Sequence, residues 1–375
     1  MRRVGPISVG GVTAEGDDAP WRLGYRPHLD GLRGMAIAFV LLHHGQLLTS
    51  GSGGTVGVTS FFVLSGFLIT SLILEELART GSVDLVRFYL RRAKRLLPAL
   101  GIVLLASTLA LALAGRLDLV AAGALGPASY AANWLLVAGF DLGPMNHAWS
   151  LAIEGQFYVI WPLALLVLLP RLGRPRLALA LICLAVAVTA ARSYAVLAGW
   201  PDHRYGWASD LQADGLLIGC VLALASKGLP QHRLLLPAGA IGLVLLALSP
   251  ETVATWSLTI IAASAVIAGG RQPDRVFGRA LSVAPLRMLG RISYGVYLWH
   301  YVVMWHAGVM DGQPQAVLAV STIVLAILLA GASYRWVEAP ILRGRRPPKT
   351  GRPLADEPIT TEGAARPRPV SAASS

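Results

Sequence analysis

Long apolar runs recur along the chain from about residue 31 to residue 338, and short polar or Arg-rich connectors separate them. Each run approaches the roughly 20 residues that a helix needs to cross a bilayer. The pattern predicts an all-α fold, a polytopic integral membrane helix bundle. The candidate spans are 31–49, 56–74, 97–115, 118–139, 148–169, 177–198, 209–226, 234–250, 252–269, 292–310 and 315–338.

The basic clusters discriminate between possible topologies. They lie at 91–95, 171–176, 227–233, 271–291 and 343–346. Cytoplasmic loops carry an excess of Lys and Arg, and every cluster falls on one side of the membrane only if run 118–139 does not cross fully. That run contains Gly123, Gly126, Pro127 and Asn133, which suit a broken or re-entrant segment. We therefore expect about ten spans, with both termini cytoplasmic.

The composition fits a membrane protein with one domain. Hydrophobic residues make up 55% of the 375 residues and charged residues 14%, against roughly 25% charged in soluble domains. Residues 25–342 leave no interval for a separate soluble domain. Residues 1–24 lack the apolar core of a cleaved signal and are expected to be disordered. The tail 343–375 is rich in Pro, Arg, Gly and Ser, which predicts a disordered cytoplasmic tail.

The formal net charge of +12 does not indicate nucleic-acid binding, because the basic residues lie in short connectors where topology accounts for them. Cys183 and Cys220 fall inside predicted spans, so we expect no disulfide framework and no metal site. The sequence has no phosphate-binding G-x-x-x-x-G-K-[ST] loop, no zinc-binding H-E-x-x-H and no G-x-S-x-G nucleophile elbow. Any chemistry is expected to need only side chains and a diffusible donor.

Titratable residues stand out in the first span, LRGMAIAFVLLHHG at 32–45. The 11 residues from Arg33 to His44 make three turns plus about 20°, so both side chains share one helix face, roughly 16 Å apart. Asp30 lies on the same stripe, whereas His43 points about 100° away. His44 either packs or bonds a carbonyl, or it faces a cavity as a general base.

Arg92 and Arg95 lie one helical turn apart in FYLRRAKRLLP, at the predicted cytoplasmic surface. Two explanations remain open for this pair. In the first explanation, the two arginines mark the cytoplasmic side of the span and contact anionic lipid headgroups. In the other, the two guanidinium groups clamp a phosphorylated cytosolic ligand, since guanidinium binds phosphate bidentately.

Further polar residues lie inside other spans. Glu154 follows His147 by seven residues, so the two side chains share one helix face. A Glu inside the membrane must pair with a cation such as Arg33 or bind substrate hydroxyls. Asp210 and Asp214, four residues apart, begin another span. A functional role and stabilisation of the helix N-terminus by acidic residues explain this pair equally well.

The ninth span, GRISYGVYLWHYVVMWHAG, places Ser293 and His300 on one face among aromatic residues. Most of those aromatic residues are explained as interfacial anchors. The candidates for substrate binding, taken over all spans, are His147, Asp214, Ser293 and His300.

Six sequence blocks, in this order, resemble the membrane-bound acyltransferase 3 family of bacteria: YRPHLDGLRGMAIAFVLLHH, GVTSFFVLSGFLIT, FYLRRAKRLLPAL, HAWSLAIEGQFYVIWP, ISYGVYLWH and YRWVEAPIL. The resemblance implies about ten spans and a cytoplasmic acyl-CoA donor. We expect the protein in the bacterial plasma membrane and, since no metal-binding spacing occurs in the sequence, no metal. The resemblance also implies O-acylation of a carbohydrate or, in actinomycete relatives, of a macrolide. The chain looks like the stand-alone form, without a fused SGNH-type domain.

The resemblance assigns roles to individual residues. The Arg-x10-His pattern of the family falls on Arg33 and His44, and its Arg-x-x-Arg pattern falls on Arg92 and Arg95. The chain departs from the family at Gly155, where a second Glu is usual. It departs also at Thr59 and at Gln212, where Asp and Arg are frequent.

Together these features predict an acyl-CoA-dependent O-acyltransferase, in which acetyl is the expected acyl group. Arg92 and Arg95 hold the phosphates of acyl-CoA, and His44 takes the proton of an acceptor hydroxyl. Asp30, Arg33 and Glu154 orient His44 and balance charge, with the imidazole and guanidinium in one hydrated chamber. A transporter or flippase is the alternative, because intramembrane charges also line translocation paths. The lack of internal repeats favours the enzyme.

Overall fold

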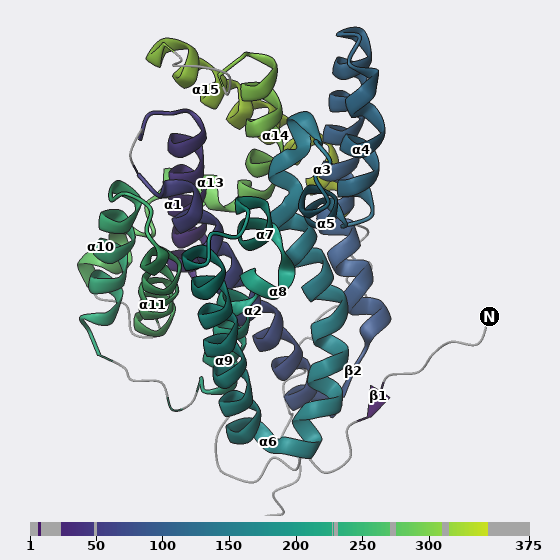
Figure 1. Cartoon of the computed structure of the whole chain (residues 1–375). Coiled ribbons are helices and arrows are strands. Elements are labelled where there is room, and N and C mark those ends of the chain that lie inside the picture. Colours follow the sequence, from purple (N-terminus) through teal and green to yellow (C-terminus); the bar gives the residue numbers. More distant parts are fainter. Residues whose placement is uncertain are drawn as a thin grey trace, which may run out of the picture.

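The structure is a computed structural model, and it describes residues 7–8, 24–48, 51–226, 228, 232–270, 275–309 and 315–343. Its architecture is the expected all-α helix bundle (Figure 1). One short antiparallel pairing joins Ile7–Ser8 (β1) to Ser82–Val83 (β2). The disorder predicted for the rest of residues 1–23 and for 344–375 lies outside the described residues.

The helices of the first half of the bundle overlap the expected apolar runs, but several begin or end a turn or more away from them. They are α1 Pro27–His44, α2 Gly53–Thr80, α3 Leu85–Leu113, α4 Leu117–Ala128, α5 Ala132–Val137, the 3-10 helix η1 Gly143–Ala148, and α6 Trp149–Leu197.

The helices of the second half do not exceed 18 residues. They are α7 Asp202–Trp207, α8 Ser209–Gln212, α9 Asp214–Leu224, α10 Leu235–Leu248, α11 Val253–Gly269, α12 Arg275–Ala280, α13 Ala284–Arg291, α14 Ser293–His306, α15 Ala316–Ser333, the π-helical turn η2 Tyr334–Glu338, and α16 Ala339–Arg343.

Two breaks in the helices fall where the sequence predicts them. Run 118–139 is divided into α4 and α5, and Tyr130 between them has a positive φ of 55°. The long α6 is two helices joined at Gly173, whose φ of 70° and ψ of 168° are not helical. Gly173 therefore separates the expected spans 148–169 and 177–198 within the basic connector 171–176.

Within the described residues, four helical segments are long and apolar enough to cross a membrane: Gly53–Thr80, Leu85–Leu113, Gly143–Leu197 and Ala316–Leu342. Four shorter helices are apolar as well, namely Leu117–Ala128, Asp214–Leu224, Leu235–Leu248 and Val253–Gly269. These lengths and compositions are those of a membrane protein. The number of crossings and their direction stay predictions.

Helix α2 lies at the centre of the bundle, packed against α1, α6, α9, α10 and α11 (Figure 1). It is buried on almost every side, as expected for a helix that is apolar all round. Small residues let the neighbouring backbones approach closely: a Cβ at Gly57 would lie 2.4 Å from the Ala36 carbonyl oxygen, and one at Gly66 would lie 2.0 Å from that of Leu216. This close packing fixes α1, which carries Arg33 and His44, against the core.

Candidate active site

A small cavity inside the bundle, of about 70 Å³, is lined by residues from α1, α2, α3, α6 and α14. We call it the arginine cavity. Its lining includes five residues that the sequence analysis selected, Arg33, Arg92, Arg95, Glu154 and Ser293. Three guanidinium groups outnumber one carboxylate, so the cavity favours an anion.

Arg92 of α3 is held in place by its own helix and by α6. Asp84 accepts a hydrogen bond from the Arg87 backbone N–H (2.9 Å) and begins α3 one turn before the basic stretch. The Arg92 guanidinium carbon lies 5.6 Å from the ring centre of Phe88 and 5.9 Å from that of Tyr158. These cation–π contacts orient the group toward the bundle rather than away from it.

Glu154 is fixed by neutral donors on two helices. The Ser65 hydroxyl of α2 donates to its Oε1 (2.8 Å), and the Tyr158 hydroxyl of α6 donates to its Oε2 (2.9 Å). Both oxygens therefore have a partner within the bundle, which lowers the cost of burying a carboxylate there.

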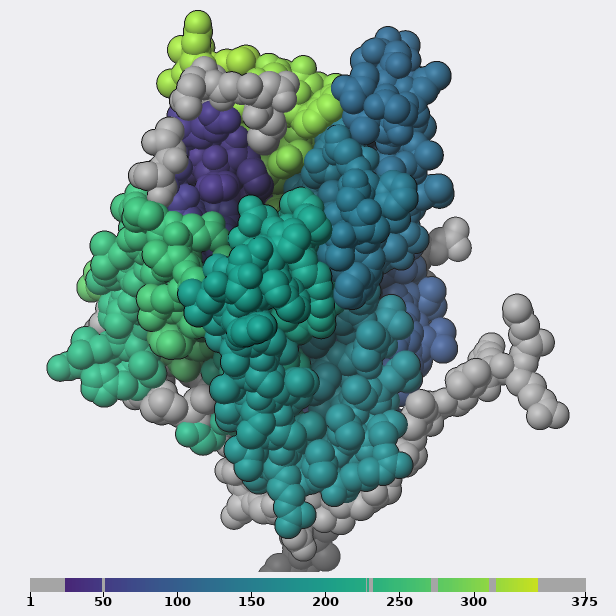
Figure 2. Space-filling model, viewed as in Figure 1, coloured from purple at the N-terminus to yellow at the C-terminus, as the bar shows by residue number. Residues whose placement is uncertain are grey.

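A second and much larger cavity, of about 680 Å³, lies at the other end of α1, and we call it the histidine cavity. Its volume is within the usual range of small-molecule sites, roughly 300–1,000 Å³. In Figure 2, α1 is seen recessed between the α10–α11 pair and the segment that carries α7, and residues of α7 and of the start of α11 line this cavity. Its aromatic lining residues are Trp149, Tyr205, Trp207, Trp256, Tyr297 and Tyr301.

His43, His44 and His147 also line the histidine cavity. The Nδ1 atom of His44 lies 3.0 Å from the Nε2 atom of His300. The His44 ring is in edge contact with the Tyr301 ring, with centres 5.3 Å apart, and with the His43 ring at the same separation. The imidazole is thus held on several sides and exposed to the cavity.

Among the described residues, neither ring nitrogen of His147 makes a hydrogen bond of normal geometry, although backbone groups of Pro144, Tyr297 and Leu298 lie close to the ring. Its side chain is 3% exposed, and its ring stacks on Tyr301 with centres 4.9 Å apart. Buried polar groups without a partner are rare in proteins and costly. Ring contacts with Tyr297, His300 and Tyr301 therefore hold this side chain in place.

The two cavities adjoin. Val58 and Tyr297 line both of them, and we call this pair the partition. The Tyr297 hydroxyl donates to the carbonyl oxygen of His147 (3.0 Å), so the Ser150 hydroxyl, 2.7 Å away, donates to Tyr297. The expectation that Arg33 and His44 share one chamber is therefore wrong, because the partition separates their cavities.

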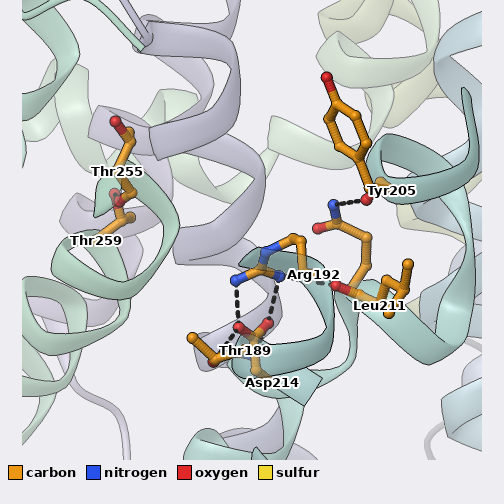
Figure 3. A network of polar contacts seen from close by, with 9 residues as sticks. Thr189, Arg192, Tyr205, Leu211, Asp214, Thr255 and Thr259 are labelled. Atoms are coloured by element: carbon orange, nitrogen blue, oxygen red, sulfur yellow. Dashed lines mark hydrogen bonds and ion pairs between the residues drawn. The ribbon is translucent and has the colours of Figure 1, made fainter. Parts of the chain in front are cut away.

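Two selected acids line neither of these two cavities. Asp30 pairs with Arg291, whose Nε lies 3.5 Å from its Oδ2. Asp214 is buried and bonded to Arg192 through both carboxylate oxygens, with an Nη1–Oδ1 distance of 3.0 Å, and it also accepts from Thr189 (Figure 3). These contacts satisfy Asp214 inside the protein and give it a structural environment.

Arg192 itself was missed by the sequence analysis. It is 2% exposed, its Nη1 donates to the Leu211 carbonyl (2.8 Å), and its guanidinium carbon lies 5.1 Å from the centre of the Trp256 ring. The signal was present, since a lone Arg in an apolar span needs an acidic partner. Asp210 and Asp214 were the available carboxylates in the next span.

Residues Asp30, Arg33 and Glu154, expected to orient His44, are placed elsewhere by the structure. Arg33 and Glu154 line the arginine cavity, and Asp30 contacts Arg291. The contact to His44 that fixes its ring comes instead from His300, which the sequence analysis selected for substrate binding. In the described part of the chain, no group of three or more His, Cys, Asp or Glu is arranged to hold a metal ion.

A family model and several known proteins are similar to this chain over most of its length. The family model described as an acyltransferase domain, of the acyltransferase 3 type, matches residues 26–335. The chain is 32% identical over 349 residues to the O-acetyltransferase OatA of Staphylococcus aureus, covering 84% of this chain and 57% of that protein. It is 34% identical over 348 residues to the putative peptidoglycan O-acetyltransferase YrhL of Bacillus subtilis, with 84% and 55% covered.

A third relative is the peptidoglycan O-acetyltransferase OatA of Listeria monocytogenes, 31% identical over 347 residues, with 84% of this chain and 56% of that protein covered. The chain thus spans little more than half the length of these curated relatives. No solved structure matches it significantly. The matched range contains the lining of both cavities, and the chain belongs to the acyltransferase 3 family.

Proposed function

We propose that this protein is a bacterial membrane O-acetyltransferase that moves an acetyl group from acetyl-CoA to a hydroxyl of a carbohydrate or macrolide acceptor. The observation that carries the proposal is the contact of two unlike cavities at the partition. One is lined by three arginines, and the other is lined by aromatic rings and His44. Membership of an acyltransferase family and similarity to three O-acetyltransferases support the reaction class.

The arginine cavity is the proposed donor site. Arg92 and Arg95 belong to a basic cluster at 91–95 that the positive-inside rule places at the cytoplasm, where acetyl-CoA is found. Guanidinium groups bind phosphate bidentately. The cavity of about 70 Å³ has room for only a few water molecules. The pantetheine arm therefore enters when side chains around it, Tyr297 among them, move aside.

The histidine cavity is the proposed acceptor site. Flat aromatic rings bury the apolar faces of a sugar or macrolactone, and Asn146 and Gln212 place amide groups in the cavity lining. Glu251 and Asp202 bring carboxylates to the same lining. Such a mixture of apolar walls and a few polar groups is typical of small-molecule sites.

In the proposed reaction, the lone pair of the His44 imidazole accepts the proton of the acceptor hydroxyl as that oxygen attacks the thioester carbonyl. A C–O bond forms, the C–S bond breaks, and the proton passes from the imidazolium to the departing thiolate. A positioned general base contributes roughly 10² to 10⁴-fold to the rate, and holding both substrates together contributes more. Ten spans with cytoplasmic termini would place donor and acceptor cavities toward opposite membrane faces.

The test is release of CoA thiol by purified full-length protein in detergent, with acetyl-CoA and a mixture of oligosaccharide and macrolide acceptors. We expect acceptor-dependent thiol release and acetyl ester formation, and a loss of about 100-fold or more in His44→Ala. His306→Ala, at the exposed end of α14, is the matched control and keeps full activity. A transporter would release no thiol, and full transfer by His44→Ala would rule out the assigned base.

A further inference from the structure

We propose that His300 is a positioning residue that holds His44 in its Nδ1–H tautomer and so leaves the His44 Nε2 atom as the proton acceptor. The inference deepens the proposed function and rests on it for the role of His44. The inference concerns which nitrogen of the His44 ring carries the lone pair. Only that nitrogen can accept a proton from a substrate hydroxyl.

The first step is the hydrogen bonding of His300 to its own helix. Its Nδ1 atom lies 2.6 Å from the Tyr297 carbonyl oxygen and 3.2 Å from that of Val296. A carbonyl oxygen only accepts hydrogen bonds. The Nδ1 atom of His300 must therefore carry a proton, and in the neutral ring its Nε2 atom carries the lone pair.

The second step follows across the helix interface. The His300 Nε2 atom lies 3.0 Å from the His44 Nδ1 atom. Because the His300 Nε2 atom is an acceptor, the His44 Nδ1 atom must be the donor. The only lone pair left on the neutral His44 ring is at Nε2, on the ring edge that does not face His300.

His300 and His44 differ in their access to the cavities, and this difference indicates different roles. His300 has no exposed surface and lines neither of the two described cavities, whereas His44 lines the histidine cavity. Both nitrogens of His300 are engaged, one by backbone carbonyls and one by His44. His300 therefore acts through His44 and does not touch substrate.

The arrangement also suits the charged state that the reaction requires. When the His44 Nε2 atom takes a proton, its Nδ1–H still donates to His300, so no tautomer exchange is needed during the step. A stronger donor then faces the same acceptor, and the hydrogen bond shortens and strengthens. A neutral acceptor at this place orients the base without adding a fixed buried charge.

The experiment compares variants of residue 300 in full-length protein in lipid nanodiscs. A Gln side chain places an acceptor oxygen near the position of the His300 Nε2 atom, whereas an Asn side chain is too short to do so. The tautomer of His44 is read by NMR of ¹⁵N-labelled histidine, with the His44 signals identified by their loss in His44→Gln. Transfer kinetics are measured on the same samples.

We expect the wild type to show His44 protonated at Nδ1 and unprotonated at Nε2. His300→Gln keeps that tautomer and lowers kcat by less than about tenfold, the effect of one altered neutral hydrogen bond. His300→Asn loses the tautomer preference and lowers kcat by roughly 100-fold, while the KM for acetyl-CoA changes by less than about threefold. His306→Asn, at the exposed end of the same helix, changes neither readout.

A wild-type His44 protonated at Nε2 would overturn the inference, and so would equal kcat losses in His300→Gln and His300→Asn. The wild-type spectrum decides even if a variant does not fold. The NMR spectrum can be recorded whether or not the protein transfers acetyl groups. A protein that shows the expected tautomer but no acetyl transfer would contradict the proposed function. It would leave the assignment of the hydrogen bond between His44 and His300 intact.

Discussion

The Tyr297 hydroxyl lies 2.7 Å from the Ser150 Oγ atom, and this hydrogen bond ties α14 to the start of α6 where the two cavities meet. Tyr297 also donates to the backbone carbonyl of His147 on η1. One side chain thus fixes three segments around the partition. Because Tyr297 lines both cavities, we expect it to control passage between them.

Replacing Tyr297 by Phe should loosen the partition. Both hydrogen bonds are lost, which costs about 1–3 kcal/mol of unfolding free energy in total. We also expect faster hydrolysis of acetyl-CoA without acceptor, because water reaches the thioester more readily. Ser150→Ala removes one of the two bonds and should give a smaller effect of the same sign, and an unchanged hydrolysis rate in both variants would limit Tyr297 to a packing role.

Substitution of the arginines should affect the phosphorylated part of the donor. Arg92→Ala and Arg95→Ala are expected to raise the KM for acetyl-CoA by about tenfold or more, and Lys should restore little, since an ammonium lacks the bidentate fork. A short acetyl thioester without phosphates should be used equally by variant and wild type. Lys94→Ala, exposed on the same helix, is the control. Equal losses with both donors would contradict phosphate binding.

Removal of the Asp214 carboxylate should destabilise the fold rather than change substrate affinity. Asp214→Asn leaves the Arg192 guanidinium buried without its counter-ion, which costs about 3–5 kcal/mol. Asp210→Asn breaks a more exposed pair with Arg204 and should cost about 0–1 kcal/mol. Thermal unfolding in detergent measures both. A stable Asp214→Asn with a raised acceptor KM would instead support the substrate-binding role that the sequence suggested.

Substitutions at Gly155 and Tyr130 should have coupled effects on the free energy of unfolding. A Cβ at Gly155 would lie 2.1 Å from the Tyr130 ring, a contact that requires one of them to shift. Gly155→Ala is therefore expected to lower stability by about 1–3 kcal/mol. Adding Tyr130→Ala should relieve the clash, so the two effects would not be additive. Gly101→Ala, where a Cβ meets nothing within 4 Å, is the control and should be neutral or stabilising.

Much of the helical framework could be predicted because membrane helices are marked by long apolar runs. The division of run 118–139 was predictable from Gly126 and Pro127, and the break in α6 at Gly173 from its basic connector. Helix lengths were less predictable. The run 209–226 is divided at Ala213 into α8 and α9, and no local signal marks that break.

Some of the residues that line the two cavities were predictable from the sequence, whereas their partners were not. Helical periodicity identified Arg33 and His44 as residues on one face, and both do line cavities. Periodicity describes one helix at a time, however. The pairing of Arg192 with Asp214, and of His44 with His300, depends on how separate helices pack, which spacing along the chain does not encode.

The partition that Val58 and Tyr297 form between the two cavities has a kinetic consequence. Two substrates in separate compartments do not compete for the same space, so each is able to bind while the other is present. Initial-rate lines at several fixed concentrations of one substrate should therefore intersect in double-reciprocal plots. Parallel lines would instead reveal an acetylated form of the protein that persists after CoA has left.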